Sequence, residues 1–349
     1  MKFFLHIGLH KTGTTSLQKN FLKNLNQNVE YNPPEIMPLL ELIFVTNKNI
    51  KSKILKVKKI VESKKKNRNA KNIFISSERI SQLFCTNNYE KNLTIIKDIF
   101  PKAKIIIFLR YQPDWLLSCY KQSIHSGDCQ SIENFLNYKN NKFKNARGTY
   151  NREGFLHTNI HKVDYSVLIE KYIKQYRKKN VHIFFFENFN KNRKKIVYEI
   201  FKILKVSSIN FVNDYKVNRG FSSLACKLSI QRYNFLKIFN LHKYLPNAKK
   251  LRNNLTTQHP SSNIPWNYAK HHRSFLELIP LFLYKVFTKI LKFFSWRSFI
   301  QNCFDKIFYI DKDMFGDEIK NKLDKMYHKK NKKLLKYVPK NKIPSIYLN

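Results

Sequence analysis

A turn near the N-terminus, rich in glycine and threonine, carries residue types suited to holding a phosphate. Residues 8–15 read Gly-Leu-His-Lys-Thr-Gly-Thr-Thr and follow the apolar segment 3–8. Backbone N–H groups at the start of a helix attract anions, and hydroxyl and ammonium groups add donors and charge. The two glycines have the spacing of a P-loop, but the lysine that follows the second glycine of a P-loop is replaced by Thr14, and Lys11 lies inside the turn. The pattern predicts an anion-binding loop, and no acidic pair suited to magnesium is evident.

A second candidate phosphate contact lies much further along the chain. Arg110 directly follows the apolar run Ile-Ile-Ile-Phe-Leu, and Ser118 comes eight residues later, in a segment that reads as a helix beginning near Pro113. A guanidinium offers several N–H groups in one plane and a hydroxyl adds another donor, so the two together suit a phosphate. We expect both to lie where a strand ends.

Short apolar runs separated by helical patterns indicate how these residues are positioned. The alternation predicts an α/β fold with a parallel sheet flanked by helices. All carboxyl ends of the strands then meet at one edge, where ligands bind in such folds. The predicted strands are residues 3–8, 72–76, 104–109 and 181–186.

The alternation ends near residue 210, which predicts two parts. The simplest division is an α/β core over residues 1–215 and a helical part over residues 216–349 that packs on it. Helical spacing of apolar residues predicts the main helices over 14–25, 51–68, 114–123, 165–178, 188–204, 221–239 and 318–337.

The two phosphate motifs resemble those of the sulfotransferases that use 3′-phosphoadenosine 5′-phosphosulfate (PAPS). In that family the 5′-phosphosulfate loop reads Lys-Thr-Gly-Thr-Thr, as residues 11–15 do, commonly followed by Ser-Leu-Gln, here 16–18, and in bacterial members preceded by His-Ile-Gly, here 6–8. The family also has an Arg at a strand end and a Ser about eight residues later, like Arg110 and Ser118. The resemblance implies a P-loop-NTPase-like sulfotransferase fold and sulfuryl transfer from PAPS without a metal.

The resemblance also implies which residues contact the co-substrate PAPS. Lys11 is expected at the oxygen that bridges phosphate and sulfate, as a catalytic cation. Arg110 and Ser118 are expected at the 3′-phosphate, where Arg219 is a further candidate. The complete predicted set is Lys11, Thr12, Gly13, Thr14, Thr15, Ser16, Arg110, Ser118 and Arg219.

The acceptor has to lose a proton, and three side chains are candidates for the general base. Glu78 follows the predicted strand 72–76 and so falls at the same sheet edge as the loop; carbohydrate-modifying members of the family often have a catalytic Glu in this neighbourhood. The alternative for Glu78 is structural, as a partner of Arg79 or a helix cap. His125, beyond the second motif, and His10, inside the loop, are the other candidates, and His10 alternatively contacts the sulfate.

The charge balance indicates anionic partners. The formal net charge is +43, from 66 Lys and Arg against 23 Asp and Glu, but only 12 of these cations are Arg. Arg is the preferred residue for bidentate contacts with phosphates and bases, so we interpret the excess as a solvated lysine surface and expect no nucleic-acid partner. The five cysteines include no CxxC pair. Free thiols in a reducing compartment are therefore favoured over a disulfide framework or a zinc site.

Residues 275–300 combine apolar and basic side chains. Such a stretch can lie on an anionic membrane surface, but we favour a buried helix whose lysines extend into solvent. Its charges argue against a membrane span, and the N-terminal segment lacks the features of a signal peptide. We expect a cytoplasmic protein, with peripheral contact at the inner face of the membrane as the alternative.

These observations predict a sulfotransferase that moves a sulfuryl group from PAPS to a hydroxyl of a glycan or glycolipid; this acceptor class is implied by the resemblance alone. Two alternatives stay open. One is a P-loop-type nucleotide or sugar kinase with an altered loop. The other is a nucleic-acid-binding protein driven by its lysine excess, although no nucleic-acid signature beyond charge is present.

Overall fold

A sheet of five parallel strands forms the centre of the computed structural model. The strand order is β2-β3-β1-β4-β7. This is the α/β arrangement with a parallel sheet that the sequence predicts. The strands are β1 (Phe3–His6), β2 (Val29–Tyr31), β3 (Asn72–Ser76), β4 (Lys104–Leu109) and β7 (Val181–Phe185). The structure describes residues 1–20, 29–45, 49–67, 71–81, 88–125, 129–145, 159–206, 220–238 and 296–349.

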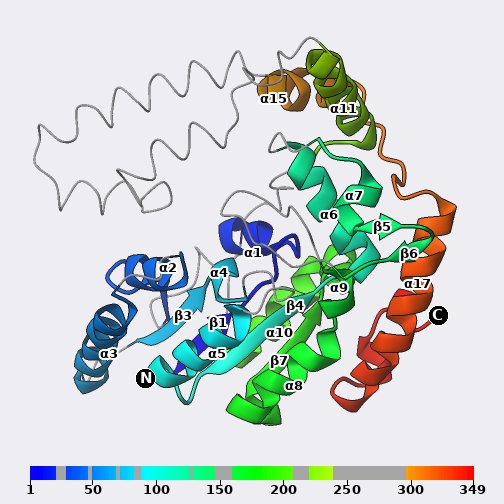
Figure 1. Ribbon diagram of the computed structural model, residues 1–349. Coiled ribbons are helices and arrows are strands. Elements are labelled where there is room, and N and C mark those ends of the chain that lie inside the picture. Colours follow the sequence, from blue (N-terminus) through cyan, green and yellow to red (C-terminus); the bar gives the residue numbers. More distant parts are fainter. Residues whose placement is uncertain are drawn as a thin grey trace, which may run out of the picture.

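Helices connect and cover the strands (Figure 1). In the first part of the chain they are α1 (Thr14–Asn20), α2 (Met37–Val45), α3 (Ile50–Lys66), α4 (Glu78–Ser81), α5 (Asn88–Ile99), α6 (Gln112–His125) and α7 (Ile132–Leu136). Further along they are α8 (Tyr165–Tyr176), α9 (Phe186–Lys191), α10 (Arg193–Leu204), α11 (Ser223–Ile238), α15 (Trp296–Phe299), α16 (Asp305–Ile307) and α17 (Asp317–Asn331).

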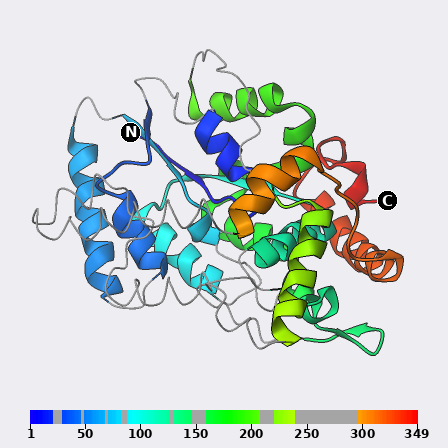
Figure 2. The ribbon, with the colours of Figure 1, turned by 90° about the horizontal axis from the view of Figure 1, so that it is seen from above.

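The sheet separates two apolar cores, because successive strand residues point to opposite faces. In β1, Leu5 joins the core formed with α2, α3, α5, α6 and α8, whereas Phe4 joins the core formed with α1, α9 and α10. The same alternation runs through β4, where Ile105 and Ile106 belong to different cores. Figure 2 looks down on the molecule and shows α1 and α10 on one side of the sheet and α3 and α5 on the other.

The strand order places the topological switch point of the sheet between β1 and β4. The chain leaves β1 toward β2 on one side of the sheet and leaves β4 toward β7 on the other side. Between two strands whose connections diverge in this way, parallel sheets form their ligand-binding crevice. The glycine–threonine turn follows β1 and Arg110 follows β4, so both predicted phosphate motifs lie at the carboxyl ends of the strands that flank this switch point. We call this place the crevice.

The described residues of the C-terminal part pack on the helices of the first core. Helix α11 contacts α6, and α17 contacts both α6 and α8. A buried hydroxyl supports this packing, since Tyr327 Oη donates to the carbonyl of Ile160 at 3.0 Å. The predicted domain boundary near residue 215 lies outside the described residues. No helix within the described ranges is long and apolar enough to cross a bilayer, and residues 275–295 are not among them.

Several predicted boundaries differ from the structure for local reasons. The predicted helix 188–204 is two helices, because Asn192 caps the second one by accepting from Lys195 N at 3.0 Å. The edge strand β2 has only three residues, too few to show a pattern. A small hairpin, β5 (Tyr138–Lys139) with β6 (Lys142–Phe143), turns through Asn140 and Asn141, which both have positive φ. Helix α17 ends at Asn331, and residues 332–336 continue as a 3₁₀ helix.

One polar side chain lies fully buried in the central strand. His6 Nδ1 is 2.7 Å from Ser76 Oγ on β3, and the ring packs edge-on against Phe108. Burial lowers the pKa of His6 from 6.5 to about 4, against a smaller opposing effect of the Glu78 charge. The folded protein therefore holds His6 neutral under conditions in which the unfolded chain protonates it.

Acid should destabilise the fold through His6. Between pH 6.5 and 4 the unfolded chain binds a proton that the folded chain does not, so the free energy of unfolding falls with pH, by ~3 kcal/mol over the whole window. His6→Asn keeps an amide near Ser76 but does not titrate, and should show a smaller fall. Urea unfolding of both proteins at about pH 7, 6 and 5 measures the two slopes. Equal slopes would contradict this account of His6.

Candidate active site

The turn after β1 is held in a conformation that only a few residue types adopt readily. Lys11 has φ +65° and Gly13 has φ +79°. A Cβ added at Gly13 would lie 2.9 Å from Cε2 of Phe186, and one added at Gly8 would overlap Thr14 Oγ1. The turn therefore needs both glycines. At Lys11 the positive φ is a strained backbone conformation for a residue other than glycine. The spacing recognised in the sequence has this structural cause.

Two side chains from the β4–α6 segment bind carbonyl groups of the turn. Arg110 Nη1 donates to the carbonyl of Lys11 at 3.0 Å, and Trp115 Nε1 donates to the carbonyl of His10 at 2.7 Å. In a planar peptide the N–H points opposite to the C=O, so these bonds also fix the direction of the N–H groups of Lys11 and Thr12. The second phosphate motif thus positions the backbone of the first.

One stripe of α6 faces the turn. Lys11 Nζ donates to Gln122 Oε1 at 2.6 Å, and Trp115 on the same helix reaches the turn through its indole N–H. Ser118 lies three residues after Trp115 and four before Gln122, so it falls on the same face of the helix. The structure thus brings Lys11, Arg110 and Ser118 together near the carboxyl ends of the inner strands β1 and β4.

The Arg110 guanidinium lies over the ring of Phe186, with Cζ 4.8 Å from the ring centroid. Its Nε is buried and has no hydrogen-bond partner among the described residues. Two carboxyl groups lie within its electrostatic reach. Burial raises the pKa of Asp114 and of Glu187 above their ordinary values, while the charge of Arg110 lowers both. Arg110 thus keeps hydrogen-bonding capacity that no residue within the described ranges uses.

Some hydroxyl groups of the turn form hydrogen bonds within the protein. Thr12 Oγ1 donates to the carbonyl of Leu9 at 2.7 Å, which closes the turn on itself. Thr14 is buried, and its hydroxyl binds the Glu78 carboxylate. Thr15 is half-buried at the start of α1 and Ser16 is buried. Of the predicted contacts, Thr12 therefore has an evident role inside the turn.

Glu78 meets the turn at the end of β3. His10 Nδ1 is 2.9 Å from Glu78 Oε2, and both side chains are about a quarter exposed, at 25% and 29%. Burial raises the pKa of Glu78, but the hydrogen bonds from His10 and Thr14 and the charge of Lys11 outweigh it, so the pKa lies below its ordinary value. At neutral pH the carboxylate is ionised and is held against the imidazole.

Arg79 does not pair with Glu78. Its guanidinium forms an ion pair with Glu41 of α2, which also accepts a hydrogen bond from Ser77 Oγ at 2.7 Å. Burial raises the pKa of Glu41 above its ordinary value, with Arg79 and Ser77 opposing the shift. The partner that the sequence offered for Glu78 is therefore taken by another carboxylate.

His125 lies at the end of α6 and is linked to Lys11 through Gln122. Gln122 Nε2 is 3.4 Å from His125 Nδ1, while the amide oxygen of Gln122 accepts from Lys11. The other ring nitrogen of His125 is 3.3 Å from Gln301 Oε1, and its ring packs edge-on against Phe221 at 4.6 Å. His125 therefore stands where the core meets the C-terminal part.

Helix α17 and the residues after it brace the start of α6. Tyr111 Oη donates to Asp324 Oδ1 at 2.7 Å and is 2.9 Å from His328 Nε2. The next residue, Gln112, exchanges two hydrogen bonds with Asn331, at 2.6 and 3.0 Å. Tyr111 N donates to Glu187 at 2.7 Å. The two residues that follow Arg110 are thus held by distant parts of the chain.

The sequence did not single out three side chains that shape the site: Trp115, Gln122 and Phe186. Trp115 and Gln122 share a helical stripe with Ser118, so a helical-wheel analysis of residues 112–125 could have found them. Phe186 has no local signal. It reaches Gly13 and Arg110 because β7 lies beside β4, and only the fold supplies that information. Arg219, the remaining predicted contact, lies outside the described residues.

Comparisons with known proteins give likenesses of fold. No family model matches the chain, and no curated protein does. A sulfotransferase from Alicyclobacillus acidocaldarius is 16% identical over 70% of this chain and 95% of its own, with a TM-score of 0.44. The sulfotransferase domain from the curacin biosynthetic pathway is 11% identical over 63% of this chain and 80% of its own (TM-score 0.36). Mouse sulfotransferase SULT7A1 complexed with PAP is 15% identical over 60% of this chain and 61% of its own (TM-score 0.35).

Alanine at Gly13 should destabilise the protein by more than ~2 kcal/mol, because positive φ and the contact with Phe186 both oppose a Cβ. Gly220→Ala is the matched control: a Cβ there meets nothing within 4 Å, so stability should change by less than about 0.5 kcal/mol. Urea unfolding gives both values. Equal stability of the two variants would show that the turn relaxes freely around Gly13.

Proposed function

We propose that the chain is a sulfotransferase that takes its sulfuryl group from PAPS. One observation carries the proposal: the Arg110 guanidinium lies 3.0 Å from the carbonyl of Lys11, so the two motifs that resemble PAPS-binding motifs meet at one crevice. Residues far apart in the sequence need not meet, and a chance match of either motif would not require it.

The residues present fit a ligand with two phosphate groups. The turn supplies its backbone N–H groups, the hydroxyl of Thr15 and the ammonium of Lys11 at one end. Arg110, with its unpaired buried Nε, and Ser118 supply a guanidinium and a hydroxyl at the other end. Arg110 donates to the backbone carbonyl of Lys11, and Lys11 donates to the side-chain amide oxygen of Gln122; these bonds orient both cations. Charged hydrogen bonds of this type are among the strongest that a protein offers a phosphate.

Sulfuryl transfer breaks the bond between sulfur and the bridging oxygen and forms a bond from sulfur to the acceptor oxygen. The bridging oxygen gains negative charge and leaves on the nucleotide phosphate. Lys11 is the cation placed to stabilise that charge, after its ammonium exchanges the Gln122 amide for the oxygen. As in phosphoryl transfer, positioning and electrostatic stabilisation do most of the work.

The acceptor hydroxyl loses its proton to the pair formed by His10 and Glu78. The ionised Glu78 accepts from His10 Nδ1, which fixes the ring and leaves Nε2 as the nitrogen that takes the proton. Glu78, the base expected from the sequence, then acts mainly by holding His10. His125 is the rival base, because it reaches Lys11 through Gln122.

A hydroxyl of a glycan or glycolipid is the proposed acceptor, on the strength of the family resemblance alone. Transfer of labelled sulfate to a cell extract, followed by separation of lipids, glycans and proteins, identifies the class directly. The proposed place of action is the cytoplasm. A kinase and a lysine-driven nucleic-acid binder remain the competing functions.

Removal of either phosphate-binding cation should abolish transfer. Lys11→Ala should lower kcat by at least about 100-fold, because charge on the leaving oxygen is then unopposed. Arg110→Ala should weaken binding of adenosine 3′,5′-bisphosphate by roughly 10- to 100-fold, the loss of a charged hydrogen bond. Radiolabelled transfer and thermal shift measure the two effects.

Exposed cations remote from the crevice give the controls, and Lys56→Ala and Lys59→Ala should leave both quantities unchanged. Wild-type turnover in both crevice variants would refute the assignment. Stabilisation by ATP with magnesium, and none by the bisphosphate, would favour the kinase. Binding to nucleic acid that falls steeply with salt, with no transfer activity, would favour the third function.

The two base assignments differ in their kinetics. Glu78→Gln and His10→Asn should each lower kcat by about 100-fold while binding of the bisphosphate stays within about twofold, because proton transfer alone is affected. His125→Asn should lower kcat by less than about tenfold. A larger loss in His125→Asn than in the other two variants would transfer the role of base to His125.

A further inference from the structure

The outer edge of β7 is open. β7 is the last strand of the sheet, and within the described residues it pairs with β4 alone. In a parallel ladder, successive residues direct their N–H and C=O groups alternately to the two sides. About half of the peptide groups of β7 therefore point away from β4. An edge of this kind is a template for another strand.

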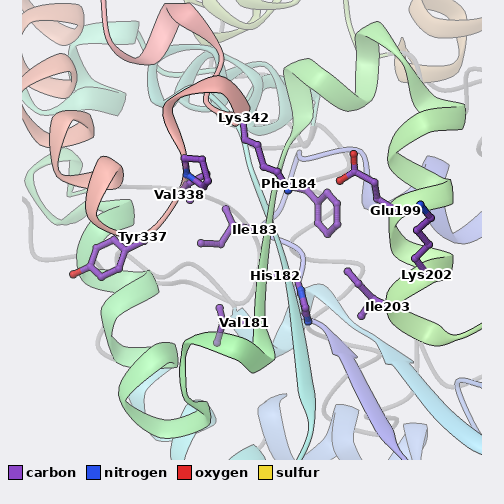
Figure 3. A pocket seen from close by; sticks show the side chains of 11 residues that line it. Val181, His182, Ile183, Phe184, Glu199, Lys202, Ile203, Tyr337, Val338 and Lys342 are labelled. Atoms are coloured by element: carbon purple, nitrogen blue, oxygen red, sulfur yellow. The ribbon is translucent and has the colours of Figure 1, made fainter.

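A groove of about 390 Å³ follows this edge (Figure 3). Its floor is β7, one wall is α10 and the other is the segment after α17. In Figure 3, Val181 and Ile183 extend toward the wall that holds Tyr337 and Val338, whereas His182 and Phe184 extend toward α10. The groove thus follows both faces of one strand edge. The lining residues are Val181, His182, Ile183, Phe184, Glu199, Lys202, Ile203, Tyr337, Val338, Pro339 and Lys342.

The groove has the two features that an added strand needs. Apolar side chains line both walls, Ile203 on the α10 side and Val338 on the other, so alternate side chains of an extended segment would each meet an apolar surface. Polar contacts are also available. In the part of the chain that the structure describes, His182 Nε2 is buried without a hydrogen-bond partner, and Lys202 and Lys342 lie one on each wall.

The charges that line the groove favour an acidic segment as its occupant. Two lysines line it against a single carboxylate, Glu199. Burial lowers the pKa of His182 to about 4, and the nearby charges of Lys104 and Lys342 add to this shift. A second copy of this chain is disfavoured as the occupant, because each copy carries a formal net charge of +43. An acidic segment complements the site.

We propose that this groove is a docking site for an extended acidic segment of another protein, which pairs with the free edge of β7 as an additional strand of the sheet. Main-chain hydrogen bonds supply the affinity, and the alternating apolar pockets and the two lysines supply the selectivity. This interaction does not depend on the sulfuryl-transfer reaction, since it uses the opposite edge of β7 from the one that pairs with β4.

A fluorescent peptide of about ten residues that alternates Val and Glu is the probe, since that length covers the strand. It should bind the full chain, and the double variant Lys202→Glu/Lys342→Glu should weaken binding by about tenfold or more. The matched control is Lys56→Glu/Lys59→Glu on α3, which makes the same change in net charge and should bind as the wild type does. Fluorescence anisotropy measures the binding of the peptide to all three proteins.

Two results would overturn the proposal. Equal weakening of peptide binding in the two double variants would mean general attraction to a basic protein. No binding to the wild type would mean that the lysines protect the edge.

A second measurement tests strand pairing on the wild-type protein and needs no variant. Amide hydrogen exchange within Val181–Phe185 should slow when the peptide is bound, while exchange in the edge strand β2 stays unchanged. A peptide with alternate backbone nitrogens methylated retains its charge but loses main-chain donors, and it should not bind. Binding of the methylated peptide, or unchanged exchange in β7, would overturn strand addition.

Discussion

The site depends on hydrogen bonds from the β4–α6 junction to the backbone of the turn between β1 and α1. Arg110 and Trp115 bind two successive carbonyls of the turn after β1, and so determine which way its amide groups point. The turn has positive φ at Lys11 and Gly13 and would not hold this shape by local preference alone. Adjacency of β1 and β4 in the sheet supplies the missing constraint. The anion-binding surface is therefore a product of the sheet order, and the strained turn is its visible consequence.

Charge is distributed around this site in a selective way. The chain has few acidic residues for its size, but Glu78 lies near Lys11, and Asp114 and Glu187 lie near Arg110. Yet the hydrogen bonds that orient Lys11 and Arg110 end on an amide oxygen and a carbonyl oxygen. Arg79, close by, is instead paired with a carboxylate. The hydrogen bonds that orient Lys11 and Arg110 therefore differ from the ion pair of Arg79, in which a carboxylate supplies the opposite charge.

How much the sequence could predict follows from how local each feature is. The turn after β1 and the Arg110–Ser118 spacing each lie within one contiguous segment, and the four longer strands have continuous apolar runs. These features could therefore be predicted from the sequence. The contact of Phe186 with Gly13 depends on β7 lying next to β4, and the break at Asn192 depends on one capping hydrogen bond. The pairing of His10 with Glu78 joins two strand ends, and the sequence offered Arg79 as the partner instead. Long-range packing decided the contacts of Phe186 and His10, whereas the cap at Asn192 is a local hydrogen bond to Lys195.

The brace on the start of α6 also has a meaning for biosynthesis. Tyr111 and Gln112 are held by Asp324, His328 and Asn331, which follow them by more than 200 positions in the chain. A ribosome makes the turn after β1 early and these bracing residues much later. During that interval the nascent polypeptide contains the turn after β1 and the β4–α6 segment, but not yet the residues of α17 that hold the start of α6. Order at the crevice is therefore gained late in translation, by closure of contacts across a great length of chain.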